Sequence, residues 1–488
     1  MATTQTRKKT SRKAKVRIEK DSMGKMEVPA DVLYGASTQR AVLNFPIAHD
    51  PLGWETISAF ARLKHAAATA NERLGKLPKR QSSLIRKACE TIYTALDEPG
   101  TRDAMMRNFP VDVYQTGSGT SSNMNVNEVV ANLACQSAGK PIGAHDPVHP
   151  NDHVNMGQSS NDTMPTAMQI AAAVHIKNDL LPSLKLLERS LRKKTRQFDK
   201  IVKIGRTHLQ DATPIRLGQE FSGYAAQIEY AIERATQAMH ELAGNMPIGG
   251  TAVGTGINTH PRFAKIVCSE LSKATGVKFT EAANHFEAQA TRDCVVDAHG
   301  HLKTISVSLS TIASNIRIMG CGPRCGIAEL DLPAVQPGSS IMPGKINPVM
   351  VESVMQVAMR DAGNDVTISI GGMGGTGSLM ELNHAMPLMA HTMMETIRLL
   401  SNVTTVFTTK CVDGLVANRR VITESVERSL MLGTALAPRI GYDEAAHIAH
   451  ECYDSGQTIR EYALEHDVLP ADELDKVLDV TTMTYPHE

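Results

Sequence analysis

The strongest constraint on the fold is a series of long segments after residue 160 in which apolar residues recur at helical spacing. This spacing predicts helices over residues 165–198, 221–244, 287–319, 348–370 and 387–409. A polar stretch precedes the first of these segments, and Asp162 or Thr163 is expected to cap that helix. Five long helices of this kind are typical of a helical bundle, so the chain is expected to be mainly α.

The composition favours a core of aliphatic and thioether side chains. Aromatic residues make up 4% of the 488 residues, with a single Trp, whereas the chain has 24 Met. Such a core suits packed helices better than a β-sandwich. A chain of this length is expected to divide into a basic tail (1–18), an N-terminal domain (19–157), a central helical bundle (158–412) and a small C-terminal helical domain (413–488).

Charge and cysteine content limit the binding partners and the cellular compartment expected for the protein. The formal net charge is zero, so the body of the chain has no field that attracts nucleic acid or membranes. No apolar run reaches the roughly 18 residues of a membrane span, and no hydrophobic signal core follows Met1. The eight scattered cysteines are interpreted as buried thiols of a reducing compartment, which predicts a cytoplasmic protein. Cys321 and Cys325 form a C-x3-C pair, but two thiols are too few for a structural metal, so no metal is expected.

The N-terminal arm from Thr6 to Arg17 is strongly basic. It contains seven Lys and Arg residues, no acid, and only Val16 as a sizeable apolar side chain. It therefore lacks the apolar face of a transit peptide and is expected to be a disordered, solvated tail. Weak contacts with polyanions are the only nucleic-acid binding expected of this chain.

The most informative motif is the loop from Gly338 to Pro348, which reads GSSIMPGKINP. It sets two hydroxyls, a cation and an amide among glycines and prolines that shape the backbone. Lys345 can act there as a point charge for an anion, and the loop could close over a site. Taken alone, the motif also fits a surface turn with a solvated lysine.

Three other segments carry chemistry of the same kind. Residues 117–128 (GSGTSSNMNVNE) crowd small hydroxyl and amide side chains that suit neutral hydrogen bonding to an anion. Residues 149–152 (HPND) and 158–162 (QSSND) form a second polar stretch. Residues 205–214 (GRTHLQDATP) contain His208, and the unperturbed pKa of a histidine suits proton transfer near neutrality.

Together these segments resemble the aspartase/fumarase superfamily, and they are most similar to class II fumarate hydratases. The similarity runs from Val28 to Asp443 and is densest over residues 117–129, 205–223, 249–261 and 322–348. It implies a three-domain fold whose central long helices form a multi-helix core in a homotetramer, with each active site assembled from three subunits. It also implies reversible, stereospecific hydration of fumarate to (S)-malate, without a metal or organic cofactor.

The resemblance implies roles for individual residues. The catalytic positions of the family match His208, Ser339 and Glu352. The substrate-binding positions match Ser118, Gly119, Thr120, Ser159, Ser160, Asn161, Thr207, Ser340, Lys345 and Asn347. A second anion site near the entrance matches His149, Pro150, Asn151 and Asp152.

The implied reaction sets clear demands on these residues. The C–H beside a carboxylate becomes acidic only when negative charge spreads into that carboxylate as an aci-anion. Stabilising this charge is the largest demand on the site, and Lys345, Asn347 and the hydroxyl groups can meet it. Ser339 would take the proton, with its oxyanion stabilised by loop amides. His208, supported by Glu352, would handle the water.

Two features depart from the usual pattern of the family. His153 stands where the family usually has Asp, and residues 349–351 (VMV) are apolar, as is more frequent in aspartases. Aspartate ammonia-lyase is therefore the main alternative, although Ser160 and Val126 stand where aspartases typically have Thr. An inactive structural relative, like some lens crystallins, is a further alternative, against which the complete catalytic set argues.

Overall fold

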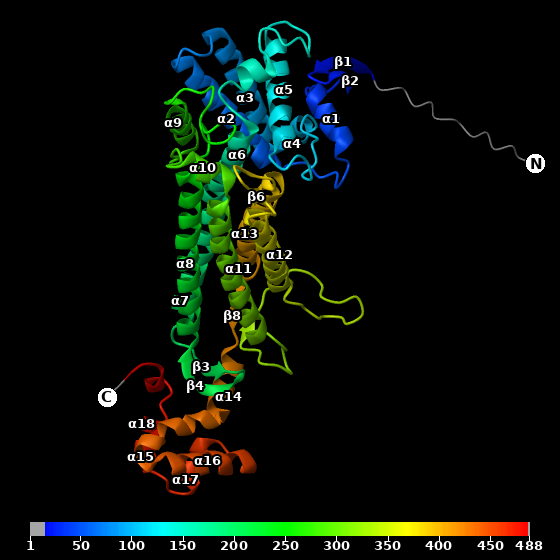
Figure 1. The fold of residues 1–488 in the computed structure, drawn as a ribbon. Helices are drawn as coiled ribbons and strands as arrows, with labels where there is room; N and C mark the ends of the chain where they lie inside the picture. Colours follow the sequence, from blue (N-terminus) through cyan, green and yellow to red (C-terminus); the bar gives the residue numbers. More distant parts are fainter. Residues whose placement is uncertain (1–14, 487–488) are drawn as a thin grey trace, which may run out of the picture. The chain divides into compact units, whose positions relative to one another are not determined.

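The computed structural model describes residues 15–486, which fold mainly into α-helices (Figure 1). The chain groups into two compact units, each built from three separate segments. The first unit comprises residues up to 178, 236–302 and 362–398, and the second comprises residues 179–235, 303–361 and those from 399 onwards. The predicted mainly α fold class is confirmed, whereas the expected three-domain division stays a prediction.

The first unit is organised around helix α2. Its elements are β1 (Val16–Asp21), β2 (Gly24–Pro29), α1 (Ala36–Asn44), α2 (Trp54–Arg73), α3 (Lys79–Asp97), α4 (Pro99–Met106), α5 (Thr120–Ser137), a π-helical turn (Pro150–Val154), α6 (Ser160–His175), α9 (Phe263–Thr275), α10 (His285–Ala290), β6 (Ser378–Leu379) and β7 (Leu382–Asn383). Helix α2 contacts α3, α5, α6 and α9. Buried alanines of α2, including Ala59, Ala66 and Ala67, let these helices approach closely.

The second unit combines a hairpin with a group of short C-terminal helices. Its elements are α7 (Leu181–Phe198), β3 (Val202–Thr207), β4 (Gln210–Arg216), β5 (Leu330–Asp331), β8 (Val416–Ala417), α14 (Arg419–Arg428), α15 (Ala437–Ile440), α16 (Tyr442–Ser455), α17 (Ile459–Glu465) and α18 (Ala471–Val477). Strand β3 pairs antiparallel with β4, and β5 pairs with β8. The C-terminal helices enclose a small core of their own, which includes Leu436, Ile448, Ile459 and Leu474.

Four long helices contribute residues to both units. They are α8 (Leu217–Gly244), α11 (Asp293–Met319), α12 (Val349–Gly372) and α13 (Met386–Lys410). The predicted ranges agree closely with these bounds, except that residues 285–290 form the separate helix α10 instead of the start of α11. Within residues 15–486, none of the helices has the apolar length that a membrane span needs.

The helix predicted over residues 165–198 is divided in the structure. Helix α6 ends at His175 and α7 begins at Leu181, with the π-helical turn Ile176–Leu180 between them. Pro182 lies in the first turn of α7, where it lacks a backbone N–H and its ring obstructs the carbonyl four residues earlier. A π-helical turn is a usual way for a helix to absorb such a break.

The expected disordered tail ends earlier than predicted. Strand β1 begins at Val16, and the Arg17 guanidinium donates a hydrogen bond of 2.8 Å to the backbone oxygen of Val32. Because the same group also reaches the carbonyls of Pro29 and Tyr34, Arg17 is an ordered part of the fold. The rest of the basic arm, before residue 15, lies outside the described residues.

The cysteines only partly follow the prediction of buried thiols. Five of them are buried, namely Cys89, Cys135, Cys268, Cys411 and Cys452. Cys321 and Cys325 are exposed, because they lie in an irregular loop just beyond the end of α11 at Met319. In the part of the chain that the structure describes, no group of three or more His, Cys, Asp or Glu side chains is arranged to hold a metal ion.

Helices α7 and α8 should depend strongly on one aromatic contact. The buried rings of Phe198 and Phe221 meet edge to face, with centroids 5.2 Å apart. We expect Phe221→Ala to lower the free energy of unfolding by about 3–5 kcal/mol, because truncation leaves a cavity. Phe286→Ala, at a residue that is 55% exposed, should cost less than about 1 kcal/mol. Urea denaturation of both variants measures the difference, and equal losses would contradict this packing argument.

Candidate functional site

Two helix N-termini of the first unit bring a row of hydroxyl groups together. Thr120 is the first residue of α5, and Ser160 is the first residue of α6. Their side-chain oxygens lie 2.7 Å apart, and the Ser118 hydroxyl lies 2.8 Å from that of Thr120. Helix N-termini favour negative charge, since their backbone N–H groups lack partners within the helix. The arrangement suits a carboxylate group.

Two glycines allow the backbone before α5 to reach this position. Gly119 has a φ of +71°, and a Cβ there would lie 2.5 Å from Cγ of Met164. A Cβ at Gly117 would lie 1.8 Å from the carbonyl oxygen of His384, and the N–H of Met386 donates to the Gly117 carbonyl. Any larger residue at either position would displace the hydroxyl groups that follow.

Helix α6 begins with a capping box. Ser159 is its N-cap, so the predicted cap at Asp162 or Thr163 is wrong by three or four residues. Asp162 nevertheless takes part, because its carboxylate accepts the N–H of Ser159 at 2.9 Å. It also accepts the N–H groups of Gly249 (3.0 Å) and Thr251 (2.9 Å). Burial raises the pKa of Asp162 to about 6.

The segment expected to form a second anion site folds into a tight turn. His149 Nδ1 accepts the backbone N–H groups of Asn151 and Asp152, and the Asp152 carboxylate lies 3.3 Å from the same nitrogen. Pro150 is buried. The N–H of His149 donates to Nδ1 of His153 at 2.8 Å, and burial lowers the pKa of His153. His153 is therefore held as a neutral acceptor that helps to shape the turn.

His208 lies at the exposed tip of the β3–β4 hairpin in the second unit. Thr207 pairs with Gln210, so His208 and Leu209 form a two-residue turn with φ values of 55° and 61°. Positive φ at both central residues is the conformation that joins antiparallel strands most tightly. The turn presents the imidazole of His208 to solvent.

The loop over residues 338–348 is closed by its own hydrogen bonds. Gly338 donates its N–H to the carbonyl of Lys345 at 2.9 Å, and the Asn347 side-chain amide donates to the carbonyl of Gly338 at 2.7 Å. The Ser339 hydroxyl oxygen accepts the N–H groups of Ile341 (3.2 Å) and Met342 (3.0 Å). Two backbone donors thus converge on the side-chain oxygen of Ser339.

The predicted catalytic side chains are not joined to one another within the described residues. His208, Lys345 and Glu352 are exposed, and over residues 15–486 their side chains make no hydrogen bond or ion pair. Ser340 is exposed in the same loop, and Glu352 lies in the first turn of α12. The structure therefore brings together Ser118, Thr120 and Ser160 of the first unit. In the second unit, His208 lies on the hairpin, Ser339 and Lys345 lie in the 338–348 loop, and Glu352 lies on α12.

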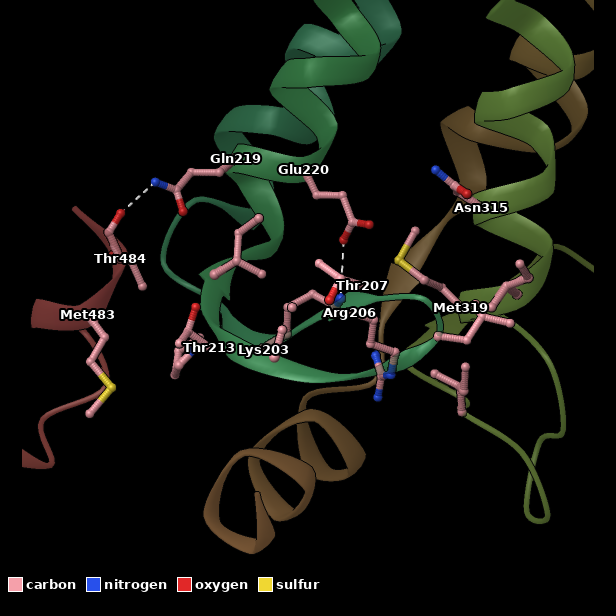
Figure 2. Close-up of a pocket in the computed structure, with 17 residues that line it drawn as sticks. Lys203, Arg206, Thr207, Thr213, Gln219, Glu220, Asn315, Met319, Met483 and Thr484 are labelled. Carbon is pink, nitrogen blue, oxygen red and sulfur yellow. Dashed lines mark hydrogen bonds and ion pairs between the residues drawn. The ribbon is translucent and has the colours of Figure 1, made fainter. Parts of the chain in front are cut away.

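A buried ionic network at the base of the hairpin has no counterpart in the sequence prediction. Lys203 lies 3.2 Å from the Glu220 carboxylate and 3.1 Å from that of Glu329, which also lies 2.7 Å from the Arg206 guanidinium. Figure 2 shows Lys203, Arg206 and Glu220 beside a cavity, which Thr207 also lines and whose volume is about 600 Å³. Arg206 and Glu329 are 123 positions apart, so the sequence alone could not reveal that they form an ion pair.

The sequence is similar to lyases, and in particular to fumarate hydratases. A family model described as lyase matches residues 24–363, and a model described as fumarase C C-terminus matches residues 432–485. The fumarate hydratase class II 2 of Bradyrhizobium diazoefficiens is 48% identical over 98% of this chain and 99% of its own length. The mitochondrial fumarate hydratase of Rhizopus oryzae is 46% identical over 95% of this chain and 91% of its own.

Solved structures show the same fold. The class II fumarase of Schistosoma mansoni superposes with a TM-score of 0.91 at 37% identity and covers 97% of this chain and 100% of its own. A cobalt-bound protein of Brucella melitensis, described as fumarate lyase:delta crystallin, gives 0.90 at 40% identity, over 97% of this chain and 100% of its own. The lyase family model matches more than half of the chain, so the chain is a member of the lyase family. Within the lyases, the chain belongs to the class II fumarate hydratase family, as the sequence resemblance predicted.

The Asp162 carboxylate is expected to contribute to the free energy of unfolding. The amide nitrogen of an asparagine cannot accept the N–H groups that the carboxylate accepts, so Asp162→Asn should lower the free energy of unfolding by about 2–4 kcal/mol. In the wild type, the folded pKa of Asp162 of about 6 exceeds its ordinary value of 3.8. The native state therefore holds a proton that the unfolded state releases, and this contribution to stability is lost as pH rises from about 4 to about 6.

Denaturation at several pH values checks both parts. Asp162→Asn should be less stable throughout and should show a flatter pH dependence between about pH 4 and about pH 6. Asp152→Asn, at an exposed carboxylate, is the matched control and should change stability by less than about 1 kcal/mol. A wild-type pH profile in Asp162→Asn would show that this carboxylate does not titrate as argued.

Proposed function

We propose that this chain catalyses the reversible hydration of fumarate to (S)-malate. The observation that carries the proposal is the hydroxyl row of Ser118, Thr120 and Ser160 at two helix N-termini, which offers neutral donors to a carboxylate. Gly119, Ser159 and Asn161 complete this part of the proposed binding site. The names of the full-length relatives support the reaction, since they are fumarate hydratases.

Ser339 is the proposed base that removes the C–H proton of malate. A serine alkoxide is too basic to form at neutral pH unless it is stabilised, and the N–H groups of Ile341 and Met342 already point at the Ser339 oxygen. These donors can act as an oxyanion hole for the base itself. The charge that develops on the substrate as an aci-carboxylate would be met by Lys345 and Asn347.

His208 is the proposed partner for water. As malate loses water, the departing hydroxide needs a proton, and in the reverse direction water must lose one. The pKa range of an imidazole suits both tasks, and the Glu352 carboxylate can stabilise its charged form. Thr207 and Ser340 adjoin these residues in the chain and would complete the substrate contacts. No step in this scheme calls for a metal or organic cofactor.

The active form is proposed to be a homotetramer in which three subunits supply each site. The exposed apolar residues of α12 support this: Met359 (67% exposed), Val366 (57%) and Ile370 (45%) recur every seven or four residues and so share one helix face. Such a stripe on a long helix is typical of a buried interface. The side chains of His208, Lys345 and Glu352, which make no hydrogen bond or ion pair within residues 15–486, would find their neighbours across that interface.

The second anion site and the cellular location belong to the same proposal. His149, Pro150, Asn151 and Asp152 would hold a carboxylate near the entrance, where the exposed Asn151 and the turn they form are accessible. The cytoplasm is the proposed location. The free cysteines suit a reducing compartment, as expected from the sequence.

Substrate choice separates this proposal from aspartate ammonia-lyase. Ammonium needs surroundings that tolerate a cation at the leaving-group position, whereas hydroxide needs a neutral pair and a proton donor. The Ser160 hydroxyl contacts Thr120, whereas Val126 is fully buried in α5 and can affect the site only through packing. We expect kcat/KM for malate to exceed that for aspartate by at least about a hundredfold.

The absorbance of fumarate, followed with malate and with aspartate in separate reactions, measures both rates. Faster formation of fumarate from aspartate would assign the chain to the ammonia-lyases. No reaction with either compound would identify an inactive relative.

Removal of the proposed base should affect turnover and spare binding. Ser339→Ala should lower kcat by roughly a hundredfold or more, because a general base contributes about that much, while KM changes little. Lys345→Ala should instead raise KM and lower kcat together, since its charge serves both bound substrate and transition state. Steady-state kinetics of both variants provide the test. A near wild-type kcat in Ser339→Ala would exclude that residue as the base.

A further inference from the structure

A fully buried lysine lies beneath the two helix N-termini. Lys64 belongs to α2 and is 0% exposed. Its ammonium group donates to the side-chain oxygens of Asn123 (2.7 Å), Asn155 (2.9 Å) and Gln158 (3.0 Å). Three acceptors around one nitrogen require three N–H donors, and only the protonated form of lysine has them.

Two of the three acceptors of Lys64 lie on segments that carry the hydroxyl row. Asn123 lies in the first turn of α5, three residues after Thr120, and its side-chain oxygen also accepts the Thr163 hydroxyl of α6 at 3.1 Å. Gln158 immediately precedes Ser159, the N-cap of α6. A single ammonium group thus connects the beginnings of both helices.

Burial of the charged Lys64 side chain costs free energy. Burial lowers its pKa to about 7, and the Asp162 carboxylate is the main charge that opposes this shift. An apolar side chain would usually stabilise such a position at least as well as a buried charge. Among residues 15–486, no carboxylate forms an ion pair with Lys64, so its charge is balanced only at a distance.

We propose that Lys64 is a positioning residue of the dicarboxylate site. It holds the N-termini of α5 and α6 at the separation at which the hydroxyls of Thr120 and Ser160 meet, 2.7 Å apart. Its positive charge lies on the protein side of these donors and favours an anion on their open side. This inference rests on the proposed function only in taking that anion to be the carboxylate of fumarate or malate.

The charge-removing variant Lys64→Met tests the role. We expect KM for fumarate and malate to rise at least about tenfold while kcat changes by less than about threefold, because binding geometry is lost and the proposed base and acid are untouched. Titration calorimetry with succinate, which cannot react, should show a rise in Kd of the same size. Lys64→Gln keeps an amide donor without the charge and should give a smaller rise in both constants.

The matched control is another buried lysine in the second unit. Lys194 is 3% exposed and donates to the carbonyl of Leu415 at 2.7 Å, a backbone group outside the proposed site. Lys194→Met should lower the melting temperature and leave KM and the succinate Kd unchanged. If both lysine variants only lower the melting temperature, Lys64 is merely structural and the proposal is wrong. If Lys64→Met does not fold, a wild-type Kd in Lys64→Gln overturns the proposal and a raised Kd supports it.

Succinate binding also separates this inference from the proposed reaction. A wild-type protein that binds succinate but does not hydrate fumarate would refute the reaction. If Lys64→Met still weakened succinate binding in that case, the positioning role would stand. Normal hydration by the wild type with unchanged succinate binding in Lys64→Met would refute the positioning role alone.

Discussion

The buried carboxylate of Asp162 is the group on which the first unit depends most. It accepts N–H groups from the start of α6 and from the loop at Gly249 and Thr251, and so joins segments almost ninety positions apart. Lys64, on α2, donates hydrogen bonds to the side-chain oxygens of Asn123 at the start of α5 and Gln158 just before α6. Because both charged groups are buried and hydrogen-bonded, the hydroxyl groups above them are held before any ligand arrives. Such preorganisation lowers the entropy that binding must otherwise overcome.

The proposed catalytic groups of the second unit are held differently from the hydroxyl groups of the first unit. Two of these catalytic groups, His208 and Ser339, lie on turns whose shapes come from local backbone geometry: the positive φ values at His208 and Leu209 and the two amides that meet the Ser339 oxygen. The ion pairs of Lys203 and Arg206 with Glu329 stabilise the hairpin that carries His208. Binding groups are thus fixed by a buried core, whereas groups proposed to move protons remain accessible at turns.

Much of the fold could be predicted, because helical periodicity records which face of a helix is buried. The bounds of α8, α12 and α13 follow from it closely. It could not reveal the π-helical turn between α6 and α7, since apolar residues continue across Pro182. Nor could it locate the cap of α6, because Ser159, Asp162 and Thr163 are all good capping residues and only the carboxylate's other partners decide between them.

The sequence by itself determined the helical class, the family and the identity of the candidate site residues, because these depend on periodicity and on motifs that are contiguous in the chain. Only the tertiary structure decided which of those residues meet. It placed Thr120 against Ser160, turned two amides toward Ser339, and revealed Lys64 and Glu329 as buried charges. The physical reason is that a side chain's partners are set by the packing of segments far apart in sequence, which periodicity along the chain does not record.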